Sequence, residues 1–192
     1  MEELPRIAVN NAIDLAKFAY DTAVDWSPSG RLNFTPEMLL ECGRLTVKGI
    51  YDCAGQWRDR FVHCDGYVPP SWRDVKAHVD EFCNYANSIE GQPLHSSAYV
   101  LWRIGWIHPF FDGNGRVARE LSYLAFLVAH KEIEFPGSPV IPELIDQKYR
   151  DEYFAGLHEA DFEWDGNTPR VEKLESLIAG LFVEQMASAN YE

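Results

Sequence analysis

Basic residues are scarce in this 192-residue sequence, in which 17 lysines and arginines face 30 aspartates and glutamates. The formal net charge of −13 argues against nucleic acid as a partner, because a phosphate backbone binds to a basic surface. An anionic ligand would have to bind at a local cluster of positive groups that acts against the overall field. A tight arginine cluster is therefore more informative here than in a basic protein.

Cysteine motifs and long apolar runs are also missing. The four cysteines form no Cys-x-x-Cys pair and have no metal-ligand spacing, so we expect reduced thiols. No apolar run approaches the ~20 residues of a membrane span. The first residues, MEELPRIAVN, lack the basic start and apolar segment of a signal peptide. We therefore expect a cytoplasmic protein that does not contact a membrane.

Helical patterns dominate what is present. Apolar spacing and capping residues predict helices over about 6–25, 35–53, 71–87, 93–107, 114–130, 143–160 and 168–188. The helix at 93–107 is apolar nearly all round, which is typical of a central, buried helix. The stretch RFVHCDGYVPP (60–70) differs, because β-forming residues flank Asp65-Gly66, a typical hairpin turn. The sequence predicts an all-α bundle with one small β-hairpin.

The segment IHPFFDGNGRVAR (107–119) is unlike the apolar sequence on both sides of it. Pro109 disfavours the α region at His108, so the preceding helix should end just before that histidine. The next helix would begin with unpaired amides and the positive end of its dipole. Gly113 and Gly115 can take positive φ and leave the backbone open to a ligand. Successive amides so arranged would form a nest that binds phosphate.

Charged side chains in the same segment complete this chemistry. Arg116 and Arg119 are three residues apart and share a helix face, where two guanidinium groups suit more than one phosphate. Asp112, at the mouth of the nest, can hold Mg²⁺ against phosphate oxygens. His108 can act as a base toward an incoming hydroxyl, because its pKa lies near working pH. The set predicts transfer from a nucleoside triphosphate to an alcohol.

Three other interpretations of the segment are weaker. In an EF-hand with Asp112 and Asn114 as ligands three and five, positions one and twelve would be Phe110 and Leu121, which carry no oxygen ligand. A Walker P-loop needs GxxxxGK[ST], which the chain does not contain. A plain capping loop would explain a lone histidine, but not the histidine, carboxylate, amide, two arginines and two glycines together.

The segment resembles the Fic (filamentation induced by cyclic AMP) motif, His-x-Phe-x-(Asp/Glu)-Gly-Asn-Gly-Arg-x-x-Arg, at every specified position from His108 to Arg119. AGQWRDRFV and GYVPP resemble the strand and flap region before the central helices, and YRDEYFAGL resembles the tyrosine-bearing helix after them. The resemblance covers about 40–160 and implies one Fic-type domain over 1–192, with the helices at 6–25 and 168–188 packed on that core.

The resemblance implies a protein adenylyltransferase, which transfers AMP from ATP to a Ser, Thr or Tyr hydroxyl of a target protein and releases pyrophosphate. His108 would deprotonate the hydroxyl, and Phe110 would anchor the loop in the core. Asp112 would hold Mg²⁺ between the α- and β-phosphates. Asn114 and the amides around the two glycines would steady the α-phosphate as charge builds there. The β- and γ-phosphates would bind to Arg116 and Arg119, in that order.

The intact glycines favour AMP transfer over the γ-phosphate transfer of kinase-like relatives. Phosphocholine or UMP transfer and a catalytically silent nucleotide-binding interaction module stay open. The hairpin resembles the family's flap, where strand addition would bring a target hydroxyl to His108. The docking residues would be His63, Cys64, Asp65, Gly66 and Tyr67. Tyr153 is a candidate adenine contact, although aromatic residues four apart, here with Tyr149, more often belong to a core.

Many Fic proteins also carry an inhibitory helix with the pattern (Ser/Thr)-x-x-x-Glu-(Gly/Asn), whose glutamate pairs with the second motif arginine. The core of this pattern occurs only as TPRVE (168–172) and SANYE (188–192), and neither is followed by Gly or Asn. We therefore expect no internal inhibitory helix. We expect Arg119 to be available to ATP unless a separate inhibitory partner supplies the glutamate.

Overall fold

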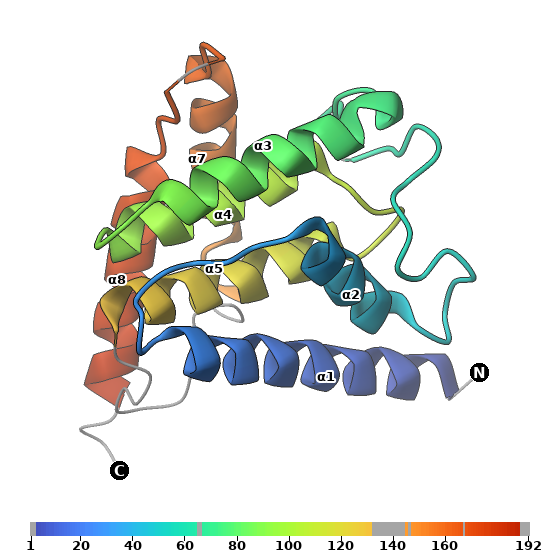
Figure 1. Ribbon diagram of the computed structural model, residues 1–192, viewed down its shortest axis with the longest axis horizontal. Coiled ribbons are helices and arrows are strands. Elements are labelled where there is room, and N and C mark those ends of the chain that lie inside the picture. Colours follow the sequence, from blue (N-terminus) through green and yellow to red (C-terminus); the bar gives the residue numbers. More distant parts are fainter. Residues whose placement is uncertain (1–2, 65–66, 132–144, 146, 167, 189–192) are drawn as a thin grey trace.

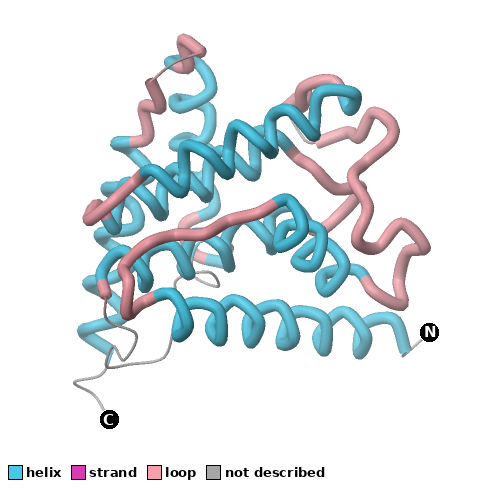
Figure 2. The backbone as a smooth tube through the Cα atoms, in the orientation of Figure 1, coloured by secondary structure: helices cyan, strands magenta, loops and turns pink. Residues whose placement is uncertain are grey.

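The fold is an all-α bundle, as the sequence predicts. The computed structural model describes residues 3–64, 67–131, 145, 147–166 and 168–188, and in this part of the chain it contains seven α-helices, one short 3-10 helix and no strand (Figures 1 and 2). The elements are α1 (Glu3–Trp26), α2 (Pro36–Val47), η1 (Trp72–Asp74), α3 (Val75–Ser88), α4 (Pro93–Ile107), α5 (Asn114–His130), α7 (Arg150–Glu163) and α8 (Glu172–Ser188).

Two buried helices, α4 and α5, form the centre of the bundle and pack against each other along their length. Helices α1 and α2 cover α5, whereas α3, α7 and α8 pack on α4 (Figure 1). The side chains of Leu101, Trp102 and Ile104 are fully buried, which confirms the prediction of a central apolar helix at 93–107. The short segment that joins α4 to α5 is therefore held at both ends by the core.

Capping residues set two helix starts as predicted. The side-chain oxygen of Thr35 accepts a hydrogen bond from the Met38 amide at 3.2 Å, and Pro36 occupies the first position of α2. The Ser71 hydroxyl accepts a hydrogen bond from the Arg73 amide at 3.2 Å, although the first turn there is the 3-10 helix η1.

Two predicted helix boundaries are wrong. Helix α2 ends at Val47 rather than near residue 53, because Lys48 leaves the helical region and Gly49 adopts φ +72°. Helix α8 begins at Glu172 rather than at residue 168. The Thr168 amide instead donates to the Asp165 side chain at 2.9 Å, so this threonine belongs to the preceding turn. Part of the helix predicted at 143–160 lies outside the described residues, and α7 covers the predicted range from Arg150 onward.

The predicted hairpin is reduced to one antiparallel bridge between Cys64 and Tyr67, and no strand forms in the described part of the 48–71 segment (Figure 2). Asp65 and Gly66 lie outside the described residues. The segment pairs with the α4–α5 connection instead of extending its own ladder. The Arg58 amide, for example, donates to the carbonyl of Pro109 at 2.9 Å.

None of the helices in the described ranges is both long enough and apolar enough to cross a membrane. Helix α2 approaches the α4–α5 connection closely at Gly43. A Cβ atom at this position would lie 2.4 Å from the ring of Phe110, which is 3% exposed and stacks on Trp57 with ring centroids 5.4 Å apart. Only glycine leaves room for the phenylalanine ring at this crossing.

We predict that Gly43→Ala lowers the free energy of unfolding by about 1–3 kcal/mol, because the added methyl group overpacks the Phe110 site. Urea unfolding measures this change. The matched control is Gly180→Ala in α8, where an added Cβ meets nothing within 4 Å. Alanine should leave stability unchanged there or raise it by up to about 1 kcal/mol. Equal stability changes in the two variants would contradict the packing argument.

Candidate functional site

Two residues with a left-handed backbone conformation shape the connection between α4 and α5. Helix α4 ends at Ile107, as predicted, and His108 follows with φ 49° and ψ 58°. Gly113 is the N-cap of α5 with φ 84°, and a Cβ atom there would lie 2.2 Å from the Thr46 side chain. The prediction of positive φ holds for Gly113 but is wrong for Gly115, which lies in the first turn of α5. The connection thus delivers the free amides of α5 to the surface.

Asn114 holds this connection in place from inside. Its Oδ1 accepts a hydrogen bond from the Phe110 amide at 2.8 Å, and its Nδ2 donates to the Phe110 carbonyl at 2.9 Å. The residue is only 2% exposed. Both polar atoms of the side chain therefore act within the loop, and a phosphate contact would have to use the second N–H of Nδ2. Phe110 is buried in the core, as expected for the loop's anchor.

Asp112 and Arg116 lie together at the start of α5. One carboxylate oxygen of Asp112 accepts a hydrogen bond from the Gly113 amide at 2.7 Å, and the other lies 3.4 Å from the Arg116 guanidinium. Arg116 also donates to the Thr46 carbonyl at 3.2 Å, at the end of α2. The aspartate remains exposed, so its outer oxygen is accessible to a cation. The arginine is held by two elements and faces the same side.

His108 is arranged as an unprotonated base. Its Nδ1 lies 3.3 Å from the Gly105 carbonyl, which can only accept, so Nδ1 carries the proton and the lone pair of Nε2 faces the Cys64 thiol. Burial lowers the pKa of His108, and the positive charge of Arg58 acts in the same direction. The Gly105 carbonyl and the Asp112 carboxylate act in the opposite direction on that pKa. The net effect lowers the pKa of His108 and so favours the neutral imidazole.

Among the described docking residues, Cys64 contacts the predicted base, with its Sγ 3.2 Å from the Nε2 atom of His108. The Tyr67 hydroxyl donates to the Trp106 carbonyl at 2.7 Å, which ties this segment to α4. His63 is exposed and lines an open cavity that also borders His108. The structure thus brings the described part of the predicted flap to the motif.

Two cavities meet at this histidine. A cavity of about 250 Å³ lies between α4 and α7, and a more open one of about 290 Å³ lies over the start of α5. His108, Gly115 and Arg119 line both cavities. The open cavity also contains the rest of the predicted phosphate site: Asp112, Gly113, Asn114 and Arg116. The motif residues expected to act together therefore lie together.

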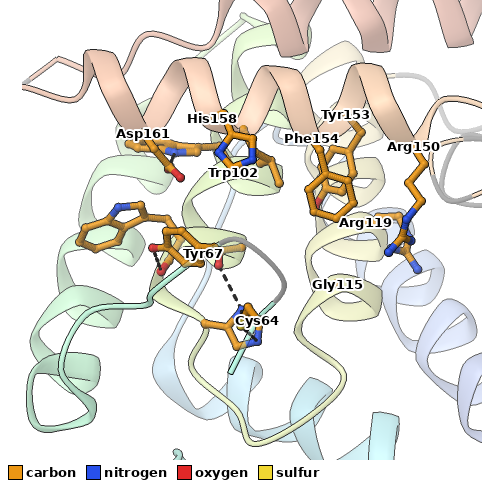
Figure 3. A pocket seen from close by; sticks show the side chains of 14 residues that line it. Cys64, Tyr67, Trp102, Gly115, Arg119, Arg150, Tyr153, Phe154, His158 and Asp161 are labelled. Atoms are coloured by element: carbon orange, nitrogen blue, oxygen red, sulfur yellow. Dashed lines mark hydrogen bonds between the residues drawn. The ribbon is translucent and has the colours of Figure 1, made fainter. Parts of the chain in front are cut away.

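The cavity between α4 and α7 has chemically different ends (Figure 3). Asp161 lies at one end, where its Oδ1 accepts a hydrogen bond from the Trp102 indole at 2.7 Å. Arg119 and Arg150 lie at the other end. Burial raises the pKa of the Asp161 carboxyl, whereas the Trp102 hydrogen bond lowers it. The cavity offers a hydrogen-bond acceptor at one end and cations at the other.

Of the α7 residues that line this cavity, the sequence predicted only Tyr153, which is 6% exposed. Tyr149 instead donates to Glu184 at 2.8 Å. The lining residues that were missed on α7 share one face of the helix: Arg150, Phe154, Leu157, His158 and Asp161. Their spacing of three and four residues was visible, but nothing in the sequence shows which neighbour α7 faces.

The positions of the two pattern glutamates do not test the expectation about an internal inhibitor. Glu172 is exposed in the first turn of α8. Glu192 lies outside the described residues. The expectation about inhibition stays a prediction.

Comparison with known proteins identifies the family. A model described as the Fic/DOC family matches residues 33–126. These residues form a Fic/DOC domain. The protein adenylyltransferase Fic of Drosophila persimilis is 32% identical over 128 residues, which are 65% of this chain and 23% of that protein. Its namesake in Drosophila grimshawi is 31% identical over 128 residues, 65% of this chain and 25% of the relative. The chain thus spans about a quarter of the length of these relatives.

Solved structures share this Fic fold. A Fic domain containing signaling protein from Bacteroides thetaiotaomicron superposes with a TM-score of 0.66 and 20% identity, covering 94% of this chain and 70% of that chain. Fic-1 from C. elegans gives a TM-score of 0.64 and 22% identity, covering 96% of this chain and 52% of that chain. The family predicted from the motif and the fold predicted with it are both confirmed.

We predict that the His108 ring titrates below the ordinary histidine pKa of about 6.5. Histidine ring resonances, assigned with a His108→Gln variant, measure the midpoint. Because the folded pKa is lowered, the unfolded chain takes up this proton first, and His108 weakens the fold as pH falls through the unfolded pKa. The same resonance in the urea-unfolded chain should return to the ordinary value. A midpoint above that value in the folded protein would contradict the burial argument.

Proposed function

We propose that this chain is a protein adenylyltransferase, which transfers AMP from ATP to a Ser, Thr or Tyr hydroxyl of a target protein and releases pyrophosphate. The single observation that carries the proposal is the place of His108 at the junction of the two cavities. If the nucleoside fills the cavity beside α7 and the terminal phosphates fill the one over α5, His108 stands beside the α-phosphate. The naming of the Drosophila relatives supports the same reaction.

The phosphates would follow the start of α5. The amides around Gly113 and Gly115 would bind the α-phosphate and stabilise the charge that builds on it during transfer. Arg116 would bind the β-phosphate, and Arg119 the γ-phosphate, through forked contacts. A local site of this kind is needed because the formal net charge of −13 repels an anionic ligand.

Mg²⁺ fits this site as an ion that is shared with the nucleotide. In the described part of the chain, no group of three or more His, Cys, Asp or Glu side chains could hold a metal ion by itself. Asp112 offers one exposed carboxylate oxygen beside the nest, which suits Mg²⁺ bound mainly by phosphate oxygens and water. When bound, the ion would neutralise charge on the phosphates.

The other end of the nucleotide would lie along α7. Aromatic and apolar side chains line the middle of that cavity, and Tyr153 would contact the nucleobase there. The Asp161 carboxylate accepts one hydrogen bond from Trp102 and can accept another from an amino group of the nucleobase. An amino-bearing base such as adenine therefore suits this end of the cavity.

The target hydroxyl would approach from the segment that carries Cys64 and Tyr67. Nε2 of His108 would take the hydroxyl proton while the hydroxyl oxygen attacks the α-phosphorus, and pyrophosphate would leave on the opposite side. In this structure the Cys64 thiol occupies the position in front of Nε2. A docked hydroxyl would have to displace that thiol, which supports docking of the target chain at the proposed flap.

We predict that ATP labelled on the α-phosphate transfers its label to protein and that ATP labelled on the γ-phosphate does not. His108→Ala should lower the transfer rate by about 10²-fold or more, because a general base contributes ~10²–10⁴-fold. ATP affinity, measured by calorimetry, should stay close to wild type. His95→Asn, at the far end of α4, is the control. Transfer of the γ label would indicate a kinase, and transfer of neither label a silent nucleotide-binding module.

We predict that Asp112→Asn removes the dependence of ATP affinity on Mg²⁺, because a neutral amide replaces the carboxylate that lines the described part of the nest. Calorimetric titration of ATP with and without Mg²⁺ measures this, independently of activity. Asp25→Asn, on the exposed side of α1, is the charge-matched control. If Mg²⁺ strengthens ATP binding equally in both variants, Asp112 does not hold the ion.

A further inference from the structure

Arg58 is a buried arginine, 4% exposed, in the connection between α2 and η1. Its guanidinium group donates hydrogen bonds to four backbone carbonyls. The distances are 2.6 Å to Pro70, 2.7 Å to His108, 3.3 Å to Ile107 and 3.4 Å to Arg60. Its own amide donates to Pro109 at 2.9 Å. A single side chain therefore binds the end of α4 and both flanks of the proposed flap.

These bonds meet specific needs of the backbone. The Ile107 and His108 carbonyls lie at the end of α4, where a helix leaves its last carbonyls without partners. His108 is also held in a left-handed conformation that costs a non-glycine residue about 1 kcal/mol or more. Two bonds from one rigid guanidinium fork stabilise that conformation and so fix the direction of the imidazole.

The same guanidinium holds the segment on which a target would dock. The Arg60 and Pro70 carbonyls flank residues 61–69, which include Cys64 and Tyr67. The flanks cannot shift relative to His108 without breaking bonds to a buried charge. Burial lowers the pKa of Arg58, which is the expected sign of a cation taken out of water.

We propose that Arg58 is a positioning residue that fixes the flap in register with His108, so that a hydroxyl docked on the flap meets Nε2. The inference rests on the proposed function for its catalytic consequence, but the coupling itself can be measured without any transfer reaction. Reactive geometry is sensitive to such coupling, because a displacement of about 1 Å can cost 10²-fold in rate.

The decisive variant is Arg58→Lys, which keeps the positive charge near His108 but replaces a five-donor fork with a single ammonium. Arg73→Lys is the matched control, because Arg73 is exposed and its guanidinium lies over the Trp72 ring. We expect Arg58→Lys to lower the rate of α-label transfer by about tenfold or more. Affinity for ATP with Mg²⁺ should stay within about threefold of wild type, because Arg58 does not line the phosphate site.

Hydrogen exchange of backbone amides tests the coupling directly. In Arg58→Lys, the flap segments 59–64 and 67–71 and the motif segment 105–111 should exchange faster together, while α1 and α8 stay unchanged. Tyr67→Phe provides a contrast, because it removes the bond to the Trp106 carbonyl but leaves the guanidinium in place. That variant should speed exchange in the flap segments alone.

Each outcome decides the proposal. Wild-type transfer by Arg58→Lys, faster exchange in only one of the two segments, or faster exchange throughout the molecule would each overturn it. If Arg58→Lys is unfolded by circular dichroism, Arg58→Gln takes its place, and unfolding of both shows that Arg58 serves the fold rather than the register. If the wild-type protein transfers no α label, the proposed function fails while the exchange result still decides the coupling.

Discussion

The site depends on one constraint: the chain must leave a buried helix, expose a short segment and enter a second buried helix within a few residues. Helices α4 and α5 are both fixed by the core, so the connection between them has little freedom. The paired hydrogen bonds between the Asn114 side chain and the Phe110 backbone close this connection, and Gly43 leaves room for the Phe110 ring. The residues of the proposed binding site at the start of α5 are held in place by this arrangement.

The positive groups at this connection contrast with the net negative charge of the whole molecule. The chain carries a strong net negative charge, yet the start of α5 gathers free amides, a helix dipole and two arginines on one side. Arg116 donates a hydrogen bond to the Thr46 carbonyl, and Arg58 donates hydrogen bonds to backbone carbonyls near His108. An anionic ligand would therefore bind at this local positive site against the repulsion of the whole molecule.

The motif could be predicted because its residues are close in sequence. Pro109 after His108 ends α4, and Gly113 adopts the left-handed conformation that the turn requires, so the backbone of the proposed phosphate site follows from local rules. The prediction for Asn114 was incomplete, since the sequence does not show that Phe110 offers both backbone partners to its amide. Asp161 and Trp102 were missed because their contact joins helices 59 residues apart in the chain.

The sequence by itself determined the helical class, the central place of residues 93–107 and the family motif at 108–119, because periodicity, caps and motif spacing are local properties. Only the tertiary structure decided that Arg58 binds the carbonyls beside His108, that Cys64 stands before Nε2, and that α7 closes the cavity. The predicted hairpin is reduced to one bridge, whereas the Arg58 amide pairs with Pro109 in the α4–α5 connection. Such pairings depend on the relative positions of distant segments, which side-chain patterns along the chain do not specify.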